Sequence, residues 1–322
     1  MIGLKGEILD TYNIVSVSGG KDSTALLLLA LERGASNLVA VFADTGHEHP
    51  ATYEYIEYLS EQVYPIRTVR ADFRQEFERR REFLRSERCK WPEEDRERAL
   101  ALLQPTGVPF LDLCMLKGRF PSAHAQFCTR ELKLKPVYEH IYRPLLEQQP
   151  LPRVVSWIGV RRQESRRRAK LPEWEAEIGD IEGGPGLFYY RPLLDWTVED
   201  VFAMLKKHGV KPNPLYLQGM RRVGCMPCIH ANKQEIREIA RRWPEHIERI
   251  AEWERLVSGV ARKEGSATFF YVAEPDGEIH YRTHGIKTVV EWAKTGRGGT
   301  QYELFAFDPE APACSSTYGL CE

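Results

Sequence analysis

The chain has 322 residues, of which 43% are hydrophobic, and its 45 Lys and Arg side chains are balanced by 46 Asp and Glu. This length allows one large domain or two modest ones, and the balanced charge argues for neither a nucleic-acid nor a membrane partner. No run of about 18 apolar residues occurs, and no basic segment followed by an apolar one stands at the start, so we expect neither a membrane span nor a secretory signal. Seven unevenly spaced cysteines indicate a cytoplasmic protein whose thiols bind a metal or react.

Residues 14–28 are typical of a short buried strand, a glycine turn and the start of an apolar helix. Glycine lets the backbone approach a ligand closely, and the free N–H groups and dipole of a helix start favour phosphate. The letters SGGKDS resemble the pyrophosphate-binding loop of N-type ATP pyrophosphatases. An ordinary strand–turn–helix connection is the alternative. We therefore assign to nucleotide binding Ser18, Gly19, Gly20, Lys21, Asp22, Ser23 and Thr24.

A parallel sheet is predicted from the alternation that follows. A helix over 23–33 leads to an apolar strand over 38–43, a helix over 51–63 and a strand over 65–69. Such sheets bind ligands beyond the carboxyl ends of their strands, so the phosphate loop and the turn of Asp44, Thr45 and Gly46 should flank one nucleotide cleft. Asp44 is a candidate for Mg²⁺ or a ribose hydroxyl, and capping of the next helix is its alternative role.

Residues 71–104 are charged and helical in pattern, which is typical of a solvated face, and residues 107–127 are expected to form a loop. A further apolar strand over 154–160 leads into a basic segment that contains Arg161 and Arg162. Arginine binds phosphate and sulfate oxygens through two parallel hydrogen bonds, so we expect this segment, with Gly159, to contact the ligand.

The last third of the chain is expected to form a mostly helical cap over the nucleotide cleft. Helices are predicted over 195–207, beginning at Asp195 or Thr197, over 234–262 with a break at Pro244, and over 286–294. Strands over 268–272 and 279–282 around the turn at 275–277 predict a small hairpin. The expected organisation is a nucleotide-binding α/β domain over 1–200 and a helical and hairpin region over 201–322.

Cys225 and Cys228 form a Cys-x-x-Cys motif, whose two thiolates can bind one metal ion or one edge of an iron–sulfur cluster. The spacing does not separate an iron–sulfur cluster, a structural zinc site and a redox dithiol. Buried structural thiols are the competing interpretation, mainly for Cys89 and Cys114.

Several of these segments occur in an order that resembles the phosphoadenosine phosphosulfate (PAPS) reductase family over residues 12–255. They are the Asp-Thr-Gly turn at 44–46, CTRELKLKP at 128–136, GVRRQES at 159–165, RPLLDWTVEDV at 191–201, NPLY at 213–216 and RVGCMPC at 222–228. The resemblance implies an adenine nucleotide alpha-hydrolase-like fold, a parallel sheet with helices on both faces. The family includes sulfonucleotide reductases, ATP sulfurylase small subunits and ATP pyrophosphatase-like enzymes of DNA phosphorothioation.

The resemblance also implies a cofactor. Cys128 stands where cluster-bearing members have a pair of cysteines, so Cys128, Cys225 and Cys228 would bind a 4Fe–4S cluster, with zinc as the alternative. Cys114, Cys314 or Cys321 could supply the fourth ligand; the alternative is an incompletely ligated cluster with one open iron, which could carry a sulfide. Cys321 is also placed like the catalytic cysteine of the family's reductases. Its setting, Gly-Leu-Cys-Glu, differs from theirs, and a terminus without function is the alternative.

Our main hypothesis from the sequence is ATP cleavage. True reductases of the family tend to lack the complete loop, whereas this chain retains it, so it is more similar to members that split ATP·Mg²⁺ into AMP and pyrophosphate. Lys21 and Asp22 would act at the leaving pyrophosphate, and Arg161 or Arg162 would hold a second oxyanion. The activated acceptor would then receive sulfur, with a cysteine desulfurase or thioredoxin-like protein as the sulfur partner. The acceptor itself (DNA, tRNA, a small molecule or a protein) stays open.

Two alternatives remain. A sulfonucleotide reductase would use Cys321 to attack sulfur and release sulfite. A subunit without catalytic activity would bind an adenine nucleotide and depend on a partner.

Overall fold

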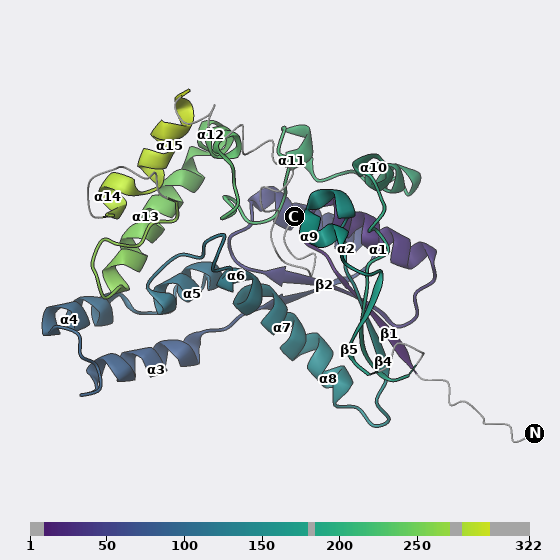
Figure 1. Ribbon diagram of the computed structural model, residues 1–322, viewed down its shortest axis with the longest axis horizontal. Helices are drawn as coiled ribbons and strands as arrows, with labels where there is room; N and C mark the ends of the chain where they lie inside the picture. Colours follow the sequence, from purple (N-terminus) through teal and green to yellow (C-terminus); the bar gives the residue numbers. More distant parts are fainter. Residues whose placement is uncertain (1–9, 180–183, 271–278, 297–322) are drawn as a thin grey trace, which may run out of the picture.

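The computed structural model describes residues 10–179, 184–270 and 279–296, and its centre is a six-stranded sheet with the order β3-β2-β1-β4-β6-β5 (Figure 1). All neighbouring strands are parallel except β5, which pairs antiparallel with β6 at the edge. The strands are β1 (Thr11–Ser16), β2 (Leu38–Asp44), β3 (Ile66–Arg70), β4 (Arg153–Trp157), β5 (Trp174–Ile178) and β6 (Gly186–Tyr190). The predicted parallel sheet is confirmed.

The helices fall into three groups along the chain. The first comprises α1 (Lys21–Glu32), α2 (Pro50–Gln62), α3 (Arg74–Arg85), α4 (Glu93–Leu102) and α5 (Pro109–Lys117). A continuous helical run follows, with α6 (Phe127–Thr129), η1 (Arg130–Leu134), α7 (Lys135–Val137), η2 (Tyr138–Tyr142) and α8 (Arg143–Leu146). The third group comprises η3 (Arg162–Glu164), α9 (Arg166–Ala169), α10 (Val198–Lys207), α11 (Pro214–Leu217), α12 (Lys233–Arg242), α13 (Pro244–Val260), α14 (Tyr281–His284) and α15 (Ile286–Lys294).

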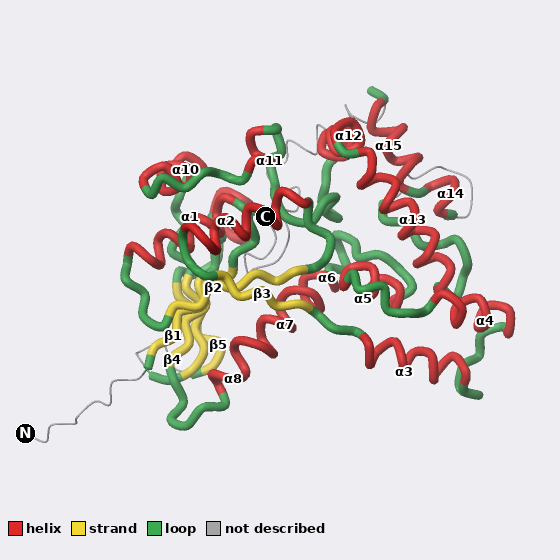
Figure 2. The backbone as a smooth tube through the Cα atoms, turned by 180° about the vertical axis from the view of Figure 1, so that it is seen from behind, coloured by secondary structure: helices red, strands yellow, loops and turns green. Residues whose placement is uncertain are grey.

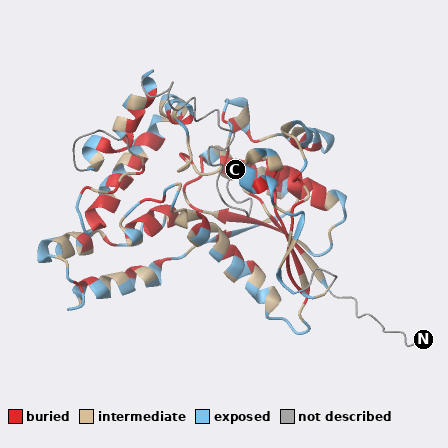
Figure 3. Ribbon diagram, viewed as in Figure 1, coloured by how far each residue is buried: buried red, intermediate tan, exposed pale blue. Residues whose placement is uncertain are grey.

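Helices cover both faces of the sheet, as predicted. On one face, α1, α2 and α10 pack on alternate residues of the strands, including Val15 and Phe42. On the other face, Val137 and Ile141 of the helical run pack against Ile14. Because successive side chains of a strand point to opposite faces, the apolar strands are buried on both sides, as expected for a parallel sheet (Figures 1 and 3).

A second core lies beside the sheet and joins distant parts of the chain. Helices α3, α4 and α5, which follow β3, share one cluster of buried side chains with α12, α13 and α15. Phe110 of α5 and Trp253 of α13 stack in this cluster with 5.8 Å between their ring centroids. Figure 2 shows these helices side by side, away from the strands. The loops between the sheet and this second core carry the candidate site.

Two of our predictions were wrong. The segment expected to be a loop over 107–127 contains α5, which is buried on all sides and therefore lacks an amphipathic pattern. The expected hairpin is also absent from the described residues: residues 268–270, expected in its first strand, form no strand, and Tyr281 and Arg282, expected in its second, begin the short helix α14. The expected turn at 275–277 lies outside the described residues. Strands β5 and β6 were not predicted.

Other predictions were confirmed. Thr197 caps α10, since its side chain accepts a hydrogen bond from the Asp200 N–H, and the helical pattern over 234–262 breaks at Pro244 into α12 and α13. Within the described ranges, no helix is both long and apolar enough to cross a membrane.

Candidate functional site

The loop after β1 has the geometry expected for anion binding. Gly19 has φ +81°, and a Cβ at this position would lie 2.9 Å from the Thr52 Cγ2 atom, so only glycine fits without displacement. The Ser23 hydroxyl donates to the Gly20 carbonyl at 3.0 Å and lies 3.1 Å from the Ser18 hydroxyl. The loop therefore leads directly into the N-terminus of α1, where free N–H groups and the helix dipole favour an anion.

Asp22, the second residue of α1, is fully buried between two cations. Its Oδ1 atom accepts a hydrogen bond from Arg161 Nε at 2.6 Å, and its Oδ2 atom lies 2.7 Å from Lys21 Nζ. Gly159, after β4, lies against this turn, and a Cβ there would approach the Asp22 carbonyl oxygen at 3.4 Å. Two cations against one carboxylate leave a net positive charge at the helix start, which suits a phosphate.

Helix α11 reaches the same loop from the other end of the chain. The Tyr216 hydroxyl accepts a hydrogen bond from the Lys21 N–H at 2.9 Å, and the Asn213 side-chain amide donates to the Gly19 carbonyl at 3.1 Å. The Lys21 ammonium lies 5.5 Å from the centre of the Tyr216 ring. The hydroxyl oxygen thus occupies a position on a backbone N–H group that a phosphate oxygen would use.

The turn after β2 holds Asp44 through three contacts. The Asp44 carboxylate accepts hydrogen bonds from the Gly46 N–H and the Tyr53 hydroxyl, each at 2.8 Å, and lies 3.4 Å from Arg70 Nε. It does not cap α2, because that role belongs to His49, whose Nδ1 accepts from the Ala51 N–H. The helix-capping alternative for Asp44 was therefore wrong.

Thr45, from the same turn, is almost completely buried beside a carboxylate. Its hydroxyl donates to Glu48 Oε1 at 2.7 Å, and the Tyr53 hydroxyl donates to Glu48 Oε2 at 2.9 Å. The desolvation of Tyr53 and its carboxylate neighbours raise the pKa of its phenol above the usual range, so this hydroxyl remains a donor.

A clamp of main-chain and side-chain contacts joins this turn to the Cys-x-x-Cys loop. His47, which is completely buried, donates from Nε2 to the Pro227 carbonyl at 2.9 Å, and the Met226 N–H donates to the His47 carbonyl at 2.9 Å. Arg249 of α13 donates to the Met226 carbonyl at 3.0 Å. Burial and the Arg249 charge lower the pKa of His47 well below its usual value, so the ring is neutral.

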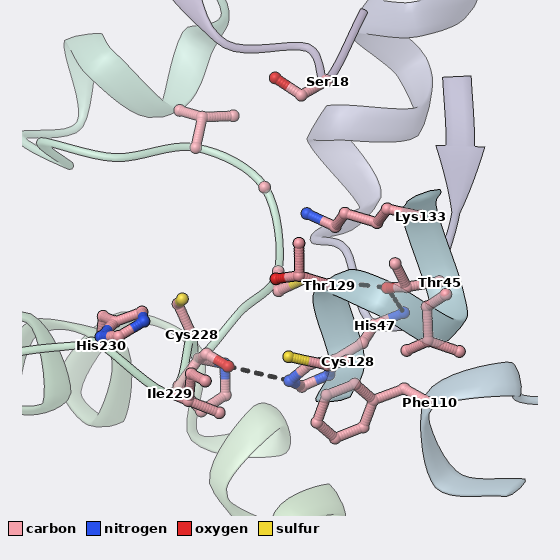
Figure 4. Close-up of a pocket in the computed structure, with 15 residues that line it drawn as sticks. Ser18, Thr45, His47, Phe110, Cys128, Thr129, Lys133, Cys228, Ile229 and His230 are labelled. Carbon is pink, nitrogen blue, oxygen red and sulfur yellow. Dashed lines mark hydrogen bonds between the residues drawn. The ribbon is translucent and has the colours of Figure 1, made fainter. Parts of the chain in front are cut away.

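The three cysteines singled out from the sequence line one cavity, together with Ser18 of the phosphate loop and Thr45 (Figure 4). Cys128 comes from α6, and Cys225 and Cys228 come from the loop that His47 holds. Lys133 of η1 and His230 also line it. The phosphate loop and the thiols, far apart in the sequence, are thus neighbours in space.

Desolvation raises the pKa of the Cys225 thiol well above its usual value. The Lys133 ammonium acts in the opposite direction. The Cys225 sulfur lies 3.6 Å from Glu48 Oε1 and 3.7 Å from the Thr45 hydroxyl, as expected for a thiol that donates weakly to oxygen.

The donor set suits a soft metal or an iron–sulfur cluster, but the side chains are not arranged as ligands. Three thiols around one cavity are the ligands that zinc and iron–sulfur clusters prefer. Yet the cavity encloses only about 30 Å³, and no three His, Cys, Asp or Glu side chains of the described residues are placed to bind one ion. The site therefore fits such a group by chemistry and position, and the side chains would have to rearrange to bind it.

The remaining predicted site residues lie elsewhere. Arg162 donates to Asp195 at 2.8 Å and to the carbonyls of Ala169 and Leu171, at the surface. Cys114 is fully buried in α5 and does not line the cysteine cavity. Cys314 and Cys321 lie outside the described residues.

Sequence reasoning missed several residues that shape the site. Each of them contacts a residue far away in the sequence, as Arg249 contacts His47, so no local pattern marks it. These residues are His47, Glu48, Asn213, Tyr216 and Arg249. The segment 213–216 is part of the order of segments that resembles the family, and this was the one sequence signal for Asn213 and Tyr216.

The sequence matches one protein-family profile and several known proteins. The profile described as "Phosphoadenosine phosphosulfate reductase domain" matches residues 12–231. An uncharacterized 37.8 kDa protein of Escherichia phage 186 is 50% identical over 334 aligned residues, which cover 97% of each chain. An uncharacterized nin region protein of Escherichia phage lambda is 27% identical over 84% of this chain and 80% of its own.

More distant matches have named activities. An adenosine 5'-phosphosulfate reductase of Allochromatium vinosum is 37% identical over 120 residues, covering 36% of this chain and 40% of that protein. Among solved structures, a phosphoadenylyl-sulfate reductase from Candida auris aligns with 15% identity and a TM-score of 0.37, over 67% of this chain and 80% of its own.

Proposed function

The chain belongs to the phosphoadenosine phosphosulfate reductase domain family, and we propose that it is an ATP pyrophosphatase-type enzyme of that family that acts in sulfur transfer. It would bind ATP·Mg²⁺ at the loop of residues 18–24 and cleave it into pyrophosphate and an adenylyl group carried by an acceptor. A sulfur nucleophile would then displace AMP. The observation that carries this proposal is that Ser18 of the phosphate loop lines the same cavity as Cys128, Cys225 and Cys228.

Charge at the phosphate loop supports ATP as the substrate. The Lys21 and Arg161 cations face the single Asp22 carboxylate, and the N-terminus of α1 adds its dipole. Lys21 would neutralise the charge that develops on the leaving pyrophosphate, whereas the buried Asp22–Arg161 pair would hold the loop in shape. A sulfonucleotide has no β,γ-pyrophosphate, so it would make less use of a complete loop.

The nucleoside would lie at the ends of β1 and β2. A small cavity there is lined by Ser16 and Ser18 of the first strand and its loop, and by Val41 and Ala43 of the second strand. Apolar strand residues and backbone groups suit an adenine ring. Asp44, at the end of β2, would accept a hydrogen bond from a ribose hydroxyl or bind the Mg²⁺ of the nucleotide.

The cysteines would bind a 4Fe–4S cluster, with zinc as the alternative, through Cys128, Cys225 and Cys228. When bound, a cluster would supply thiophilic iron or one-electron chemistry. Cys321 stays a candidate for the fourth ligand. His47, by holding the Pro227 carbonyl, would orient the loop that carries two of these thiols.

The experiment that tests the function compares ATP with PAPS. We expect titration calorimetry of the full chain to show tighter binding of ATP than of PAPS. Lys21→Ala should weaken ATP binding at least about tenfold, the loss of a charge-assisted phosphate contact. Lys287→Ala is the matched control, since Lys287 pairs with Glu248 at the surface. Tighter PAPS binding, together with no ATP-dependent pyrophosphate release from candidate acceptors, would refute the proposal.

A second function is favoured by the 37% identity to an adenosine 5'-phosphosulfate reductase. In this reaction the Cys321 thiolate would attack the sulfur of a sulfonucleotide, forming an S-sulfonate and releasing the nucleotide. A thioredoxin-like dithiol would then reduce the S-sulfonate and free sulfite. Cys321→Ser should abolish sulfite release. Sulfite release that persists in this variant would exclude the mechanism.

A further inference from the structure

A separate cavity of about 550 Å³ lies between the helical run of residues 127–146 and the sheet. Its walls are formed by the helical run on one side and by β4, β5 and β6 on the other, and Figures 1 and 2 show α7 and α8 beside these strands. The volume is within the range of about 300–1,000 Å³ that small-molecule sites occupy. Of the residues that we assigned to the nucleotide or to the cysteines, Ser16 alone lines this cavity, at its inner end.

This cavity adjoins the proposed reaction centre. It shares Ser16 and Val137 with the small cavity at the ends of β1 and β2. That small cavity shares Ser18, Lys133 and Gly224 with the cysteine cavity. Three cavities thus lie in a row, and a molecule in the large one would have the phosphate loop and the thiols beyond its inner end.

The lining combines aromatic rings with hydrogen-bonding groups. Tyr138 is 42% exposed at this cavity, and Tyr189 of β6 also lines it. The Tyr142 hydroxyl lies 2.7 Å from the Ser156 hydroxyl, and burial raises the pKa of Tyr142 to about 12, so both groups stay neutral. Exposed aromatic rings provide a surface on which a planar heterocycle can stack.

The charged groups of the cavity indicate which heterocycle it suits. Glu131 and Glu177 line it, and a carboxylate can accept a hydrogen bond but donates none, so they favour a base with an exocyclic amino group over one with only carbonyls. Arg130 and Lys135 line it as well and are exposed to solvent, where they can bind a phosphate. Arg130 pairs with Glu131 at 2.7 Å, and we therefore assign phosphate binding mainly to Lys135.

We propose that this cavity is the acceptor site and that it binds a second nucleotide, distinct from ATP, whose base carries an amino group and stacks on Tyr138. The inference rests on the proposed function, since an acceptor is required only if ATP is used for activation. The base would contact Glu177 and the phosphate would contact Lys135. The inner end of the cavity at Ser16 would direct the acceptor toward the α-phosphate.

The test uses CMP and UMP as probes. The base of CMP has an amino group at the position where the base of UMP has a carbonyl. The full chain is saturated with a non-hydrolysable ATP analogue and titrated with each nucleotide. We expect CMP to bind at least about fivefold more tightly than UMP, and Tyr138→Ala to weaken CMP binding about fivefold or more. Phe83→Ala is the matched control, because Phe83 is similarly exposed, at 37%, and lies on α3 outside this cavity.

Lys21→Ala separates this inference from the proposed function. It should weaken binding of the ATP analogue at least about tenfold and leave CMP binding intact. Failure of ATP to bind the unmodified chain would contradict the proposed function alone. Equal binding of CMP and UMP, an unchanged affinity in Tyr138→Ala, or no saturable binding up to about 5 mM would each overturn the acceptor site.

Discussion

Arg161 Nε lies 2.6 Å from Asp22 Oδ1, and both side chains are almost completely removed from solvent. This pair joins the end of β4 to the first turn of α1, the two elements that meet where the strand order of the sheet reverses. Lys21, on the other side of the same carboxylate, is the more exposed cation. The buried pair therefore shapes the loop, and Lys21 is the charge available to a ligand.

Replacement of Arg161 should destabilise the fold. Arg161→Leu would leave the Asp22 carboxylate buried with Lys21 as its one remaining charged contact, so we expect a loss of about 3 kcal/mol in the free energy of unfolding. Chemical denaturation measures this loss. Arg255→Leu is the control, since Arg255 pairs with Glu252 at the surface and should cost no more than about 0.5 kcal/mol. Equal effects of the two substitutions would contradict the role of the buried pair.

Gly19 should tolerate alanine less well than Gly34 does. Both have positive φ, +81° and +63°, but a Cβ at Gly19 would lie 2.9 Å from Thr52 Cγ2, whereas nothing lies within 4 Å at Gly34. Gly34→Ala should cost about 1 kcal/mol from backbone strain alone. Gly19→Ala should cost a further 1–3 kcal/mol, roughly, from the steric overlap. The comparison of their unfolding free energies checks this, and a cost at Gly19 no larger than at Gly34 would refute it.

Removal of the Tyr216 hydroxyl should strengthen nucleotide binding. This hydroxyl accepts the Lys21 N–H, so a phosphate oxygen that binds the same N–H group would have to displace it. Tyr216→Phe removes the competing acceptor, and we expect the ATP Kd to fall by about two- to tenfold, as one hydrogen bond allows. Tyr64→Phe is the control, because the Tyr64 hydroxyl donates to the Leu38 carbonyl away from the loop. A higher ATP Kd for Tyr216→Phe than for the unmodified chain would contradict the prediction and show that the hydroxyl contributes to binding.

His47 should control the reactivity of the Cys-x-x-Cys thiols. His47→Phe keeps an aromatic ring against Phe110 but removes the donor to the Pro227 carbonyl. We expect the loop to loosen, with a loss of about 1–3 kcal/mol in stability. Thiol labelling with a disulfide reagent should become about tenfold faster, since exposure of the thiols follows loop opening. His208→Phe is the control, because His208 contacts Glu32 at the surface, and it should leave the labelling rate unchanged. Equal labelling rates in the two variants would contradict the role of His47 in holding the Cys-x-x-Cys loop.

The contribution of Glu254 to stability should fall between about pH 5 and pH 7, opposite in sign to the contributions of His47 and His246, whose pKa values burial lowers. Burial raises the pKa of this carboxyl from 4.5 to about 7, although it accepts hydrogen bonds from the Phe269 and Ile286 N–H groups. The folded state then binds more protons at this carboxyl than the unfolded state does in this window, so the Glu254 contribution decreases as pH rises, by about 3 kcal/mol in total. Denaturation curves of the unmodified chain and of Glu254→Gln at several pH values measure this contribution as the difference between the two free energies of unfolding. A difference that does not change with pH would contradict the prediction.

The phosphate loop could be predicted from the sequence because its geometry is local. Gly19, Lys21 and Ser23 lie within five residues, and a strand, a turn and a helix start are each specified by neighbours in the chain. The same holds for Thr197, whose capping of α10 depends on Asp200 three residues later. Such features follow from the pattern of residue types alone.

The clamp around the cysteines could not be predicted in this way. His47 and Pro227 are 180 positions apart, and Arg249 comes from a helix of the second core. Helix α5 was missed for a related reason: it is apolar on all sides and therefore has no helical periodicity. Pro109 at its start and Gly118 at its end, with φ +61°, were the available signals.

The shared core of α3–α5 and α12–α15 sets a limit on how this protein can be shortened for expression. The family profile ends at residue 231, just before α12, yet α13 packs on α4 and α5. A fragment that stops there would expose Phe110, Leu113 and their neighbours to water, a contiguous apolar surface of the kind that promotes aggregation. A soluble fragment therefore has to include α15 and to extend at least to Lys294.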